Sequence, residues 1–162
     1  MTTYTLTPRR HRVTAAKAGA AVLLAVATSG ILLSVSVVLN LLAPPWTDAS
    51  GRWDRASTLV VQVTIVGVVG VLAGVAFGLM LQNSPLAIVL YFALPIAVSI
   101  VAEIVTRLQD PLRWVDINLT LPALYQPGVT AAEWARVGAS VLVWVVVPFV
   151  AGAVRTSRRE VA

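Results

Sequence analysis

The 162-residue chain has no cysteine, a single histidine and few charged residues, which make up 12% of the sequence. The absence of cysteine excludes disulfides, thiolate zinc sites and thiol nucleophiles. The one histidine, His11, cannot supply the paired axial ligands of a membrane haem. Soluble domains carry about a quarter charged residues, so this chain lacks the polar surface that a soluble protein needs. The hydrophobic share of 58% also excludes an intrinsically disordered chain.

The charges that are present leave three long uncharged stretches, of 30, 47 and 18 residues, at 18–47, 56–102 and 137–154. A helix needs roughly 20 residues to cross the hydrocarbon core of a bilayer. The first and third stretches therefore fit one spanning helix each, and the middle stretch fits two. The sequence predicts an all-α transmembrane bundle of four helices, at about 18–42, 57–81, 85–105 and 134–155.

Local signals mark where two of these helices begin. The only polar cluster of the middle stretch is 82–85, where Ser84 can cap a helix and Pro85 suits the first helical position. This cluster predicts a tight hairpin between two spans. Before the last span, Thr130 and Glu133 have the spacing of a capping box.

The distribution of basic residues predicts the orientation. The two ends of the chain, 1–17 and 155–162, carry seven of the twelve basic residues and only one acid, Glu160. The segments 43–56 and 106–136 carry five basic and five acidic residues. By the positive-inside rule, both termini face the cytoplasm. This topology accounts for the net charge of +5 without any binding of nucleic acid.

The predicted organisation is a single transmembrane domain at 18–155, with outer loops at 43–56 and 106–133 and basic cytoplasmic tails at 1–17 and 156–162. Within the outer loop at 106–133, Asp110 and Pro111 can start a short helix. The predicted location is the bilayer of a cell membrane, in a bacterium.

Three glycines and two prolines stand out inside the predicted spans. Gly70, Gly74 and Gly78 recur every fourth residue and predict a helix-packing seam, either inside the protein or with a second copy of it. Pro95 and Pro148 each remove a backbone donor, and we expect both to kink their helices as static features of shape.

Glu103 is the only acidic residue inside a predicted span. An intramembrane charge can act as a proton relay or a substrate counter-ion. The alternative is an interfacial ion pair with Arg107, four residues later on the same helix face. The sequence shows no catalytic constellation, phosphate-binding glycine loop or metal-spaced ligand set, so we expect no enzyme, no cofactor and no metal site.

Three strings carry a resemblance to a known family. TTYTLTPRRHRVTAAK resembles the cytoplasmic segment of type-2 ABC transporter permeases, which precedes their third membrane helix. GVLAGVAFGLMLQNSPLAIVLYFALP is similar to their small-residue helix, the hairpin after it and the next helix. WARVGASVLVWVVVPFVAGAVRTSRREV is similar to their last helix and basic tail. The resemblance covers nearly the whole chain, but it matches the last four helices of a six-helix permease, with the first two missing.

The resemblance implies that the chain is a membrane-spanning permease component of an ATP-driven transporter and that this transporter is an exporter. ATP hydrolysis would belong to a separate ATP-binding subunit, and a second permease chain would complete a homo- or heterodimer. The residues implied in coupling to the ATP-binding subunit are Thr7, Pro8, Arg9, Arg10 and Arg12. Two alternatives stay open: a stand-alone ion- or proton-coupled carrier that uses Glu103, and a non-transporting membrane scaffold or remnant.

Overall fold

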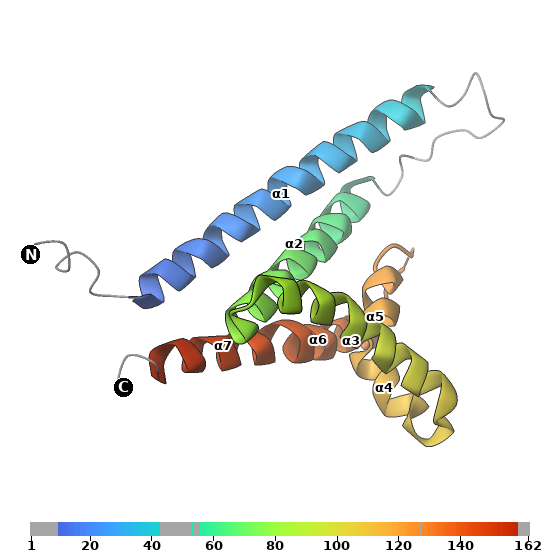
Figure 1. Ribbon diagram of the computed structural model, residues 1–162. Coiled ribbons are helices and arrows are strands. Elements are labelled where there is room, and N and C mark those ends of the chain that lie inside the picture. The colour runs from blue at the N-terminus through green and yellow to red at the C-terminus, as the bar shows by residue number, and fades with distance from the viewer. Residues whose placement is uncertain (1–9, 43–52, 54–55, 127, 159–162) are drawn as a thin grey trace, which may run out of the picture.

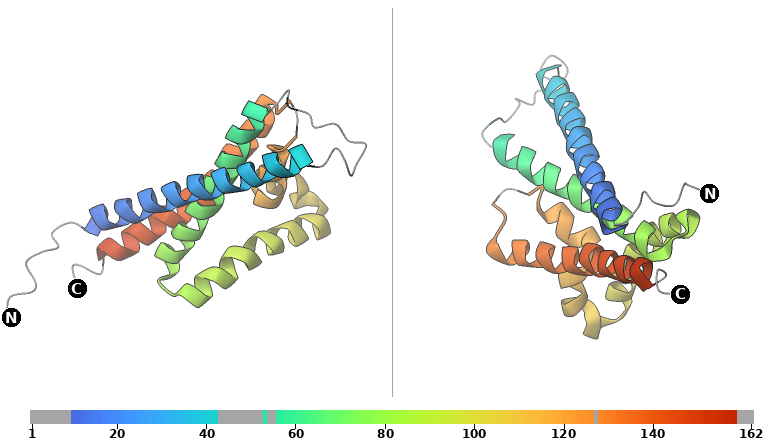
Figure 2. Two further views of the ribbon diagram at one scale, coloured as in Figure 1. Left: turned by 90° about the horizontal axis from the view of Figure 1, so that it is seen from above. Right: turned by 90° about the vertical axis from the view of Figure 1, so that its left-hand side faces the viewer.

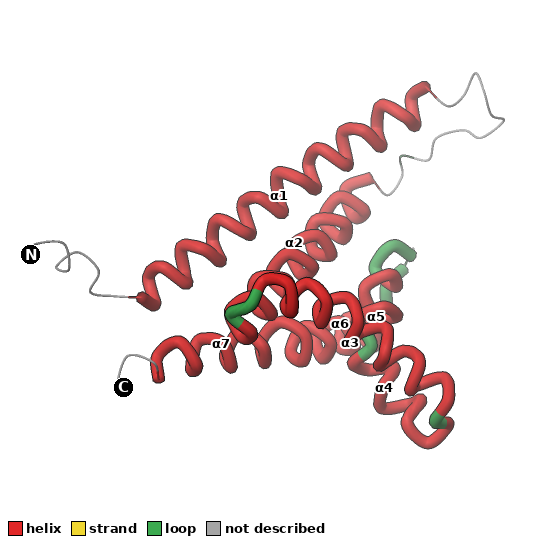
Figure 3. The backbone as a smooth tube through the Cα atoms, in the orientation of Figure 1, coloured by secondary structure: helices red, strands yellow, loops and turns green. Residues whose placement is uncertain are grey.

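The computed structural model describes residues 10–42, 53, 56–126 and 128–158, and every regular element in them is helical (Figures 1 and 3). The elements are α1 (Arg10–Leu42), α2 (Ala56–Leu81), α3 (Ser84–Ile104), the 3-10 turn η1 (Thr106–Leu108), α4 (Gln109–Val115), α5 (Ile117–Ala123), α6 (Ala131–Val141), the π-helical segment η2 (Leu142–Val146) and α7 (Val147–Arg158).

Four stretches of helix are long and apolar enough to cross a membrane. They are Ala18–Leu42, Ala56–Leu81, Ser84–Ile104 and Ala131–Thr156, the last made of α6, η2 and α7 together. The four predicted spans are thereby confirmed, and the fourth begins three residues earlier than expected. Large apolar side chains such as Leu24 and Ile31 are 65% exposed, which suits contact with lipid tails. The protein is an all-α membrane bundle.

The segment predicted as the outer loop at 106–133 is mostly helical. It contains η1, α4 and α5, and α4 includes the Asp110-Pro111 pair that the sequence indicated as a helix start. Asp116 ends α4 and begins α5, because its extended backbone breaks the helix between Val115 and Ile117. The two short helices therefore form a bent helical segment rather than an irregular loop, and this segment is called the α4–α5 hairpin below.

Helix α2 is the central element of the bundle, and it contacts α1, α3, α7 and η2. The aromatic part of the core is built around Phe77, whose ring stacks on Trp144 and meets Tyr91 edge-on at centroid distances of 6.3 and 6.2 Å. A second core cluster joins Val69 and Ala73 of α2 to Val145 of η2. Helix α1 packs mainly on α2 and leaves most of its surface exposed (Figure 2).

The first turn of α1 and the last turn of α7 lie towards the same end of the molecule (Figures 1 and 2). The hairpin between α2 and α3 lies towards this end as well. The end of α3, the beginning of α6 and the α4–α5 hairpin lie at the opposite end. This arrangement is the one that an even number of spans requires.

Two glycines allow the closest approaches between helices. A Cβ atom added to Gly67 of α2 would lie 2.5 Å from the Oγ atom of Ser29 in α1. A Cβ atom added to Gly152 of α7 would lie 2.7 Å from the backbone of Leu79 and Met80 in α2. The α1–α2 and α2–α7 contacts therefore depend on positions that have no side chain.

The predicted seam at Gly70, Gly74 and Gly78 is not where the helices of this chain pack most closely. A Cβ atom at Gly70 would lie 3.7 Å from the Tyr91 hydroxyl, which is an ordinary contact. Gly74 and Gly78 are exposed, and no atom of the described residues lies within 4 Å of their Cβ positions. Helix packing inside the described chain thus uses only the first of the three, while packing against a second copy stays a prediction.

The two prolines affect their helices differently. Helix α3 runs through Pro95 without interruption. Pro148 follows directly on the π-helical segment η2, in which the Val147 N–H donates to the carbonyl of Leu142, five residues earlier. A proline ring collides with the carbonyl four residues before it, and a wider π turn is a common accommodation. The predicted distortion at Pro148 therefore takes the form of a π bulge.

One helix cap differs from the prediction. The cap of α3 is Asn83 rather than Ser84, because the Asn83 side chain accepts a hydrogen bond from the N–H of Leu86 at 3.2 Å. The predicted capping box is confirmed: Thr130 Oγ1 accepts from the N–H of Glu133, and Glu133 Oε2 accepts from the N–H of Thr130.

We expect Gly152→Ala to lower the stability of the bundle by about 1–3 kcal/mol, because overpacking forces backbones apart. The matched control is Gly74→Ala, which adds the same methyl group where nothing lies within 4 Å. The control should keep or slightly raise stability, since alanine is the better helix former. Thermal unfolding in detergent tests the pair, and equal melting temperatures would contradict the close α2–α7 packing.

Candidate functional site

A buried carboxylate lies at the centre of a polar cluster between α3 and α5. Asp116 is 1% exposed. Its Oδ2 atom accepts a hydrogen bond from Ser99 Oγ at 2.7 Å, and its Oδ1 atom accepts from the N–H of Asn118 at 2.9 Å. Asn118 closes the ring by donating through Nδ2 to Ser99 Oγ at 3.1 Å. Asp116 thus caps α5 and ties it to the middle of α3.

A second set of hydrogen bonds holds the same hairpin against α6 and η2. Thr120 Oγ1 donates to Ser140 Oγ at 2.8 Å, and Ser140 Oγ donates to the carbonyl of Trp114 at 3.3 Å. Trp144 Nε1 donates to the carbonyl of Val115 at 2.6 Å. The α4–α5 hairpin is therefore fixed to three other elements by polar contacts of buried groups.

A cavity of about 250 Å³ lies beside this polar cluster. Its lining is supplied by α2, α3, α5 and η2 and consists of Gly70, Ala73, Phe77, Tyr91, Phe92, Pro95, Ile96, Ile117, Asn118, Leu121 and Trp144. The α2 wall contains Gly70 and Ala73, whose small size leaves room opposite the rings of α3. Tyr91 spans part of that wall and donates its hydroxyl hydrogen to the carbonyl of Gly70 at 3.3 Å.

The geometry of this site supports binding of a small apolar group. An apolar cavity of about 150 Å³ is large enough to hold benzene, and this cavity is larger. Asn118 both lines the cavity and belongs to the Asp116 cluster, so a bound group would lie against the hydrogen-bonded ring. Within the described residues, no group of three or more His, Cys, Asp or Glu is placed to hold a metal ion.

The coupling segment implied by the resemblance lies almost wholly outside the described residues. Thr7, Pro8 and Arg9 are outside them. Arg10 and Arg12 belong to the first turn of α1, but their side chains are not described. The coupling role of this segment stays a prediction.

Glu103 lies at the end of α3, and the predicted ion pair with Arg107 does not form between these two described residues. The helix ends at Ile104, because Val105 takes an extended conformation with φ −104° and ψ 92°. Arg107 belongs to the following 3-10 turn, so the two side chains no longer share one helix face. Glu103 is exposed and lies outside both the cavity lining and the Asp116 cluster.

Asp116 was not predicted as a site residue, because its charge was attributed only to the predicted outer loop at 106–133. The sequence nevertheless contains a pattern that points to Asp116. Asp116 is the single acid in the apolar string LRWVDINLTL, and the polar residues Asn118 and Thr120 follow it at alternate positions. An isolated aspartate in apolar surroundings is a good helix cap, and it needs partners when it is buried.

The fold and site define a class of protein: a four-span helical membrane protein whose α4–α5 hairpin is fixed by buried polar contacts. Comparisons with family models, with curated proteins and with solved structures return no match. The class therefore rests on the helices and their contacts.

We expect Asp116→Ala to lower stability by about 2–4 kcal/mol, because it removes a helix cap and leaves the Ser99 and Asn118 donors without their charged acceptor. Asp110→Ala is the matched control, since Asp110 is an acid of the same hairpin that is 97% exposed. The control should change stability by less than about 0.5 kcal/mol. Thermal unfolding in detergent measures both, and equal losses would show that Asp116 does not hold the hairpin.

Proposed function

We propose that this protein is the membrane-spanning permease subunit of an ATP-driven transporter, of the type-2 ABC permease kind, and that it works as an exporter in a bacterial plasma membrane. In this proposal both ends of the chain face the cytoplasm, a separate subunit hydrolyses ATP, and a second permease chain completes the complex. The observation that carries the proposal is the continuity of α1, which joins the basic segment to the first span.

Helix α1 is longer than a membrane span. Its 33 residues correspond to about 50 Å of helix. The apolar span begins at Ala18, so residues 10–17 extend the same helix about 12 Å beyond the hydrocarbon. A helix without a break transmits a push on one end to the other. A partner that moved the basic segment would therefore move the span.

The contacts of α1 lead to the cavity. Ser29 packs into the gap at Gly67 of α2, and Gly70, less than one turn further along α2, belongs to the cavity wall. A displacement of α1 therefore displaces α2, which forms one wall of the cavity. Through these contacts, an ATP-binding partner that moves α1 changes the shape of the cavity without touching the cavity itself.

The exposed glycines of α2 fit the proposed second permease chain. Gly74 and Gly78 lie one turn apart with no side chain over them from the described residues. Small residues at this spacing let helices of two chains approach closely in lipid. The carrier alternative has less support, because Glu103 lies outside the cavity lining.

Reversing the charge of the N-terminal segment should weaken the association with the ATP-binding subunit. We expect Arg9→Glu with Arg10→Glu to reduce co-purification of an ATP-binding subunit from native membranes at least tenfold. The matched control reverses two basic residues of the other end, Arg158→Glu with Arg159→Glu, and should retain the partner. Failure of the unaltered chain to retain any ATP-binding subunit in mild detergent would refute the proposal.

Interrupting α1 should separate binding from transport. Ala16 is exposed and lies in the extension before the span, so Ala16→Pro breaks the helix there without disturbing packing. We expect the ATP-binding subunit to remain bound while ATP-driven export into inverted vesicles falls at least tenfold. Ala16→Leu is the control and should export normally. Export that survived the proline would rule out α1 as the mechanical link.

A further inference from the structure

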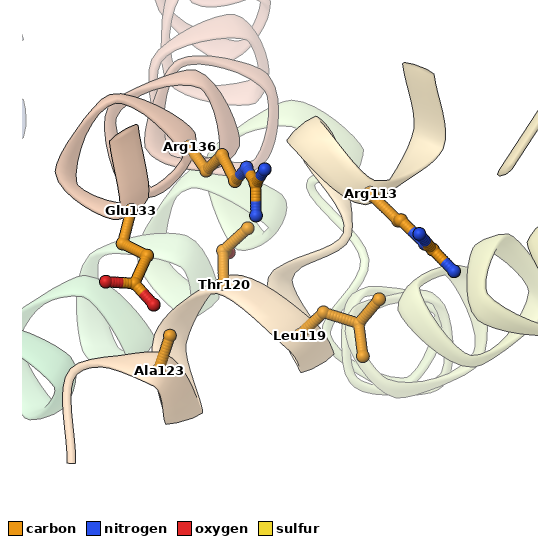
Figure 4. A pocket seen from close by; sticks show the side chains of 6 residues that line it. All are labelled: Arg113, Leu119, Thr120, Ala123, Glu133 and Arg136. Atoms are coloured by element: carbon orange, nitrogen blue, oxygen red, sulfur yellow. The ribbon is translucent and has the colours of Figure 1, made fainter. Parts of the chain in front are cut away.

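A second pocket, of about 140 Å³, lies between α4, α5 and the beginning of α6 (Figure 4). Its lining residues are Arg113, Leu119, Thr120, Ala123, Glu133 and Arg136. The two arginines come from different helices, Arg113 from α4 and Arg136 from α6, while Leu119 and Ala123 of α5 supply apolar surface (Figure 4).

The guanidinium groups of this pocket retain donors that the described residues do not use. Arg136 lies over the ring of Trp114, with 5.6 Å from Cζ to the ring centroid, and has no hydrogen-bond acceptor within the described chain. Arg113 reaches only the exposed Asp110, at 4.0 Å. Arg155, by contrast, donates to the carbonyl of Met80 at 2.8 Å. Each of these two guanidinium groups still offers several N–H groups in a planar fork.

The carboxylate of the pocket is already engaged. Glu133 Oε2 accepts from the N–H of Thr130 at 2.6 Å and from its hydroxyl at 2.8 Å. The charge of Arg136 acts on Glu133 from three residues further along α6, but no ion pair within 4.0 Å joins the two among the described residues. Two arginines and one glutamate leave the pocket with a formal charge of +1.

The position of the pocket indicates which anion it meets. It lies at the start of the fourth span, Ala131–Thr156, next to the half-exposed Trp114 and Trp134. Tryptophan collects at the level of the lipid headgroups, where the phosphodiester is the common anion. Arginine matches phosphate oxygens through paired hydrogen bonds. A cavity of about 150 Å³ holds the six carbon atoms of benzene, so this pocket has room for a five-atom phosphate group.

We propose that this pocket binds the phosphodiester group of a membrane phospholipid, with Arg136 as the donor inside the pocket, the exposed Arg113 as a donor at its rim (Figure 4), and Leu119 and Ala123 against the glycerol. The site does not depend on the transport function and would exist in a scaffold protein as well. A bound phosphate would fix the α4–α5 hairpin to α6 beside the Thr120–Ser140 hydrogen bond, which joins the same two elements.

Native mass spectrometry of the full chain in mild detergent tests this site. The probe is dioctanoyl phosphatidylglycerol, and the matched control lipid is dioctanoylglycerol, which has the same chains and no phosphate. We expect the phospholipid adduct to form at a concentration at least tenfold lower than that of the control lipid. Equal binding of the two lipids would overturn the proposal.

Substitutions of the two arginines test whether this pocket is the place where the phospholipid binds. Arg113→Gln with Arg136→Gln should weaken phospholipid binding about tenfold or more, and the exposed Arg113→Gln alone should weaken it in part with an unchanged melting temperature. The control is Arg107→Gln, an exposed arginine near the same end that lies outside the pocket lining. Unchanged binding in the double variant would overturn the site. If inorganic phosphate displaces the lipid at an equal concentration, the ligand of the pocket is a soluble phosphate, and the proposal of a lipid ligand is wrong.

Discussion

The structure depends on one constraint, which is that polar groups inside a bilayer must find their partners within the protein. Asp116 shows the consequence most clearly. Its carboxylate is buried at the junction of two short helices, and it is tolerated there because Ser99 and Asn118 donate to it. That ring of hydrogen bonds ties the chain between the third and fourth spans to α3, while the Thr120–Ser140 and Trp144–Val115 hydrogen bonds tie it to α6 and η2. Through α5, this segment supplies one wall of the cavity.

The second determinant is the small size of particular residues on α2. Gly67 admits Ser29 of α1, and Gly70 with Ala73 leaves the space that becomes the cavity. One helix therefore connects the long α1, which carries the basic segment, to the aromatic lining contributed by α3 and η2. In lipid, where apolar burial gives little drive for helix association, such close contacts determine the arrangement of the spans.

The two proposals give charged side chains separate roles at the two ends of the bundle. In the first, the basic residues at the start of α1 form the helical extension that the ATP-binding partner contacts. In the second, the arginines of the α4–α6 pocket, beside Trp114, meet the phosphate of a lipid headgroup. Both roles follow from position relative to the spans, because a charge near the hydrocarbon is stable only beside water, a headgroup or a counter-charge.

The sequence by itself determined the four spans, the tight hairpin before Pro85 and the capping box at Thr130, because these depend on local apolar length and on contacts within a few residues. It could not assign the partners of Asp116, which lie on α3 and α5, nor show that Arg107 leaves the helix face of Glu103. It also could not tell that Gly67 and Gly152, rather than Gly74 and Gly78, face neighbouring helices. Those facts depend on the rotation of each helix about its axis, and only contacts between segments distant in the sequence fix that rotation.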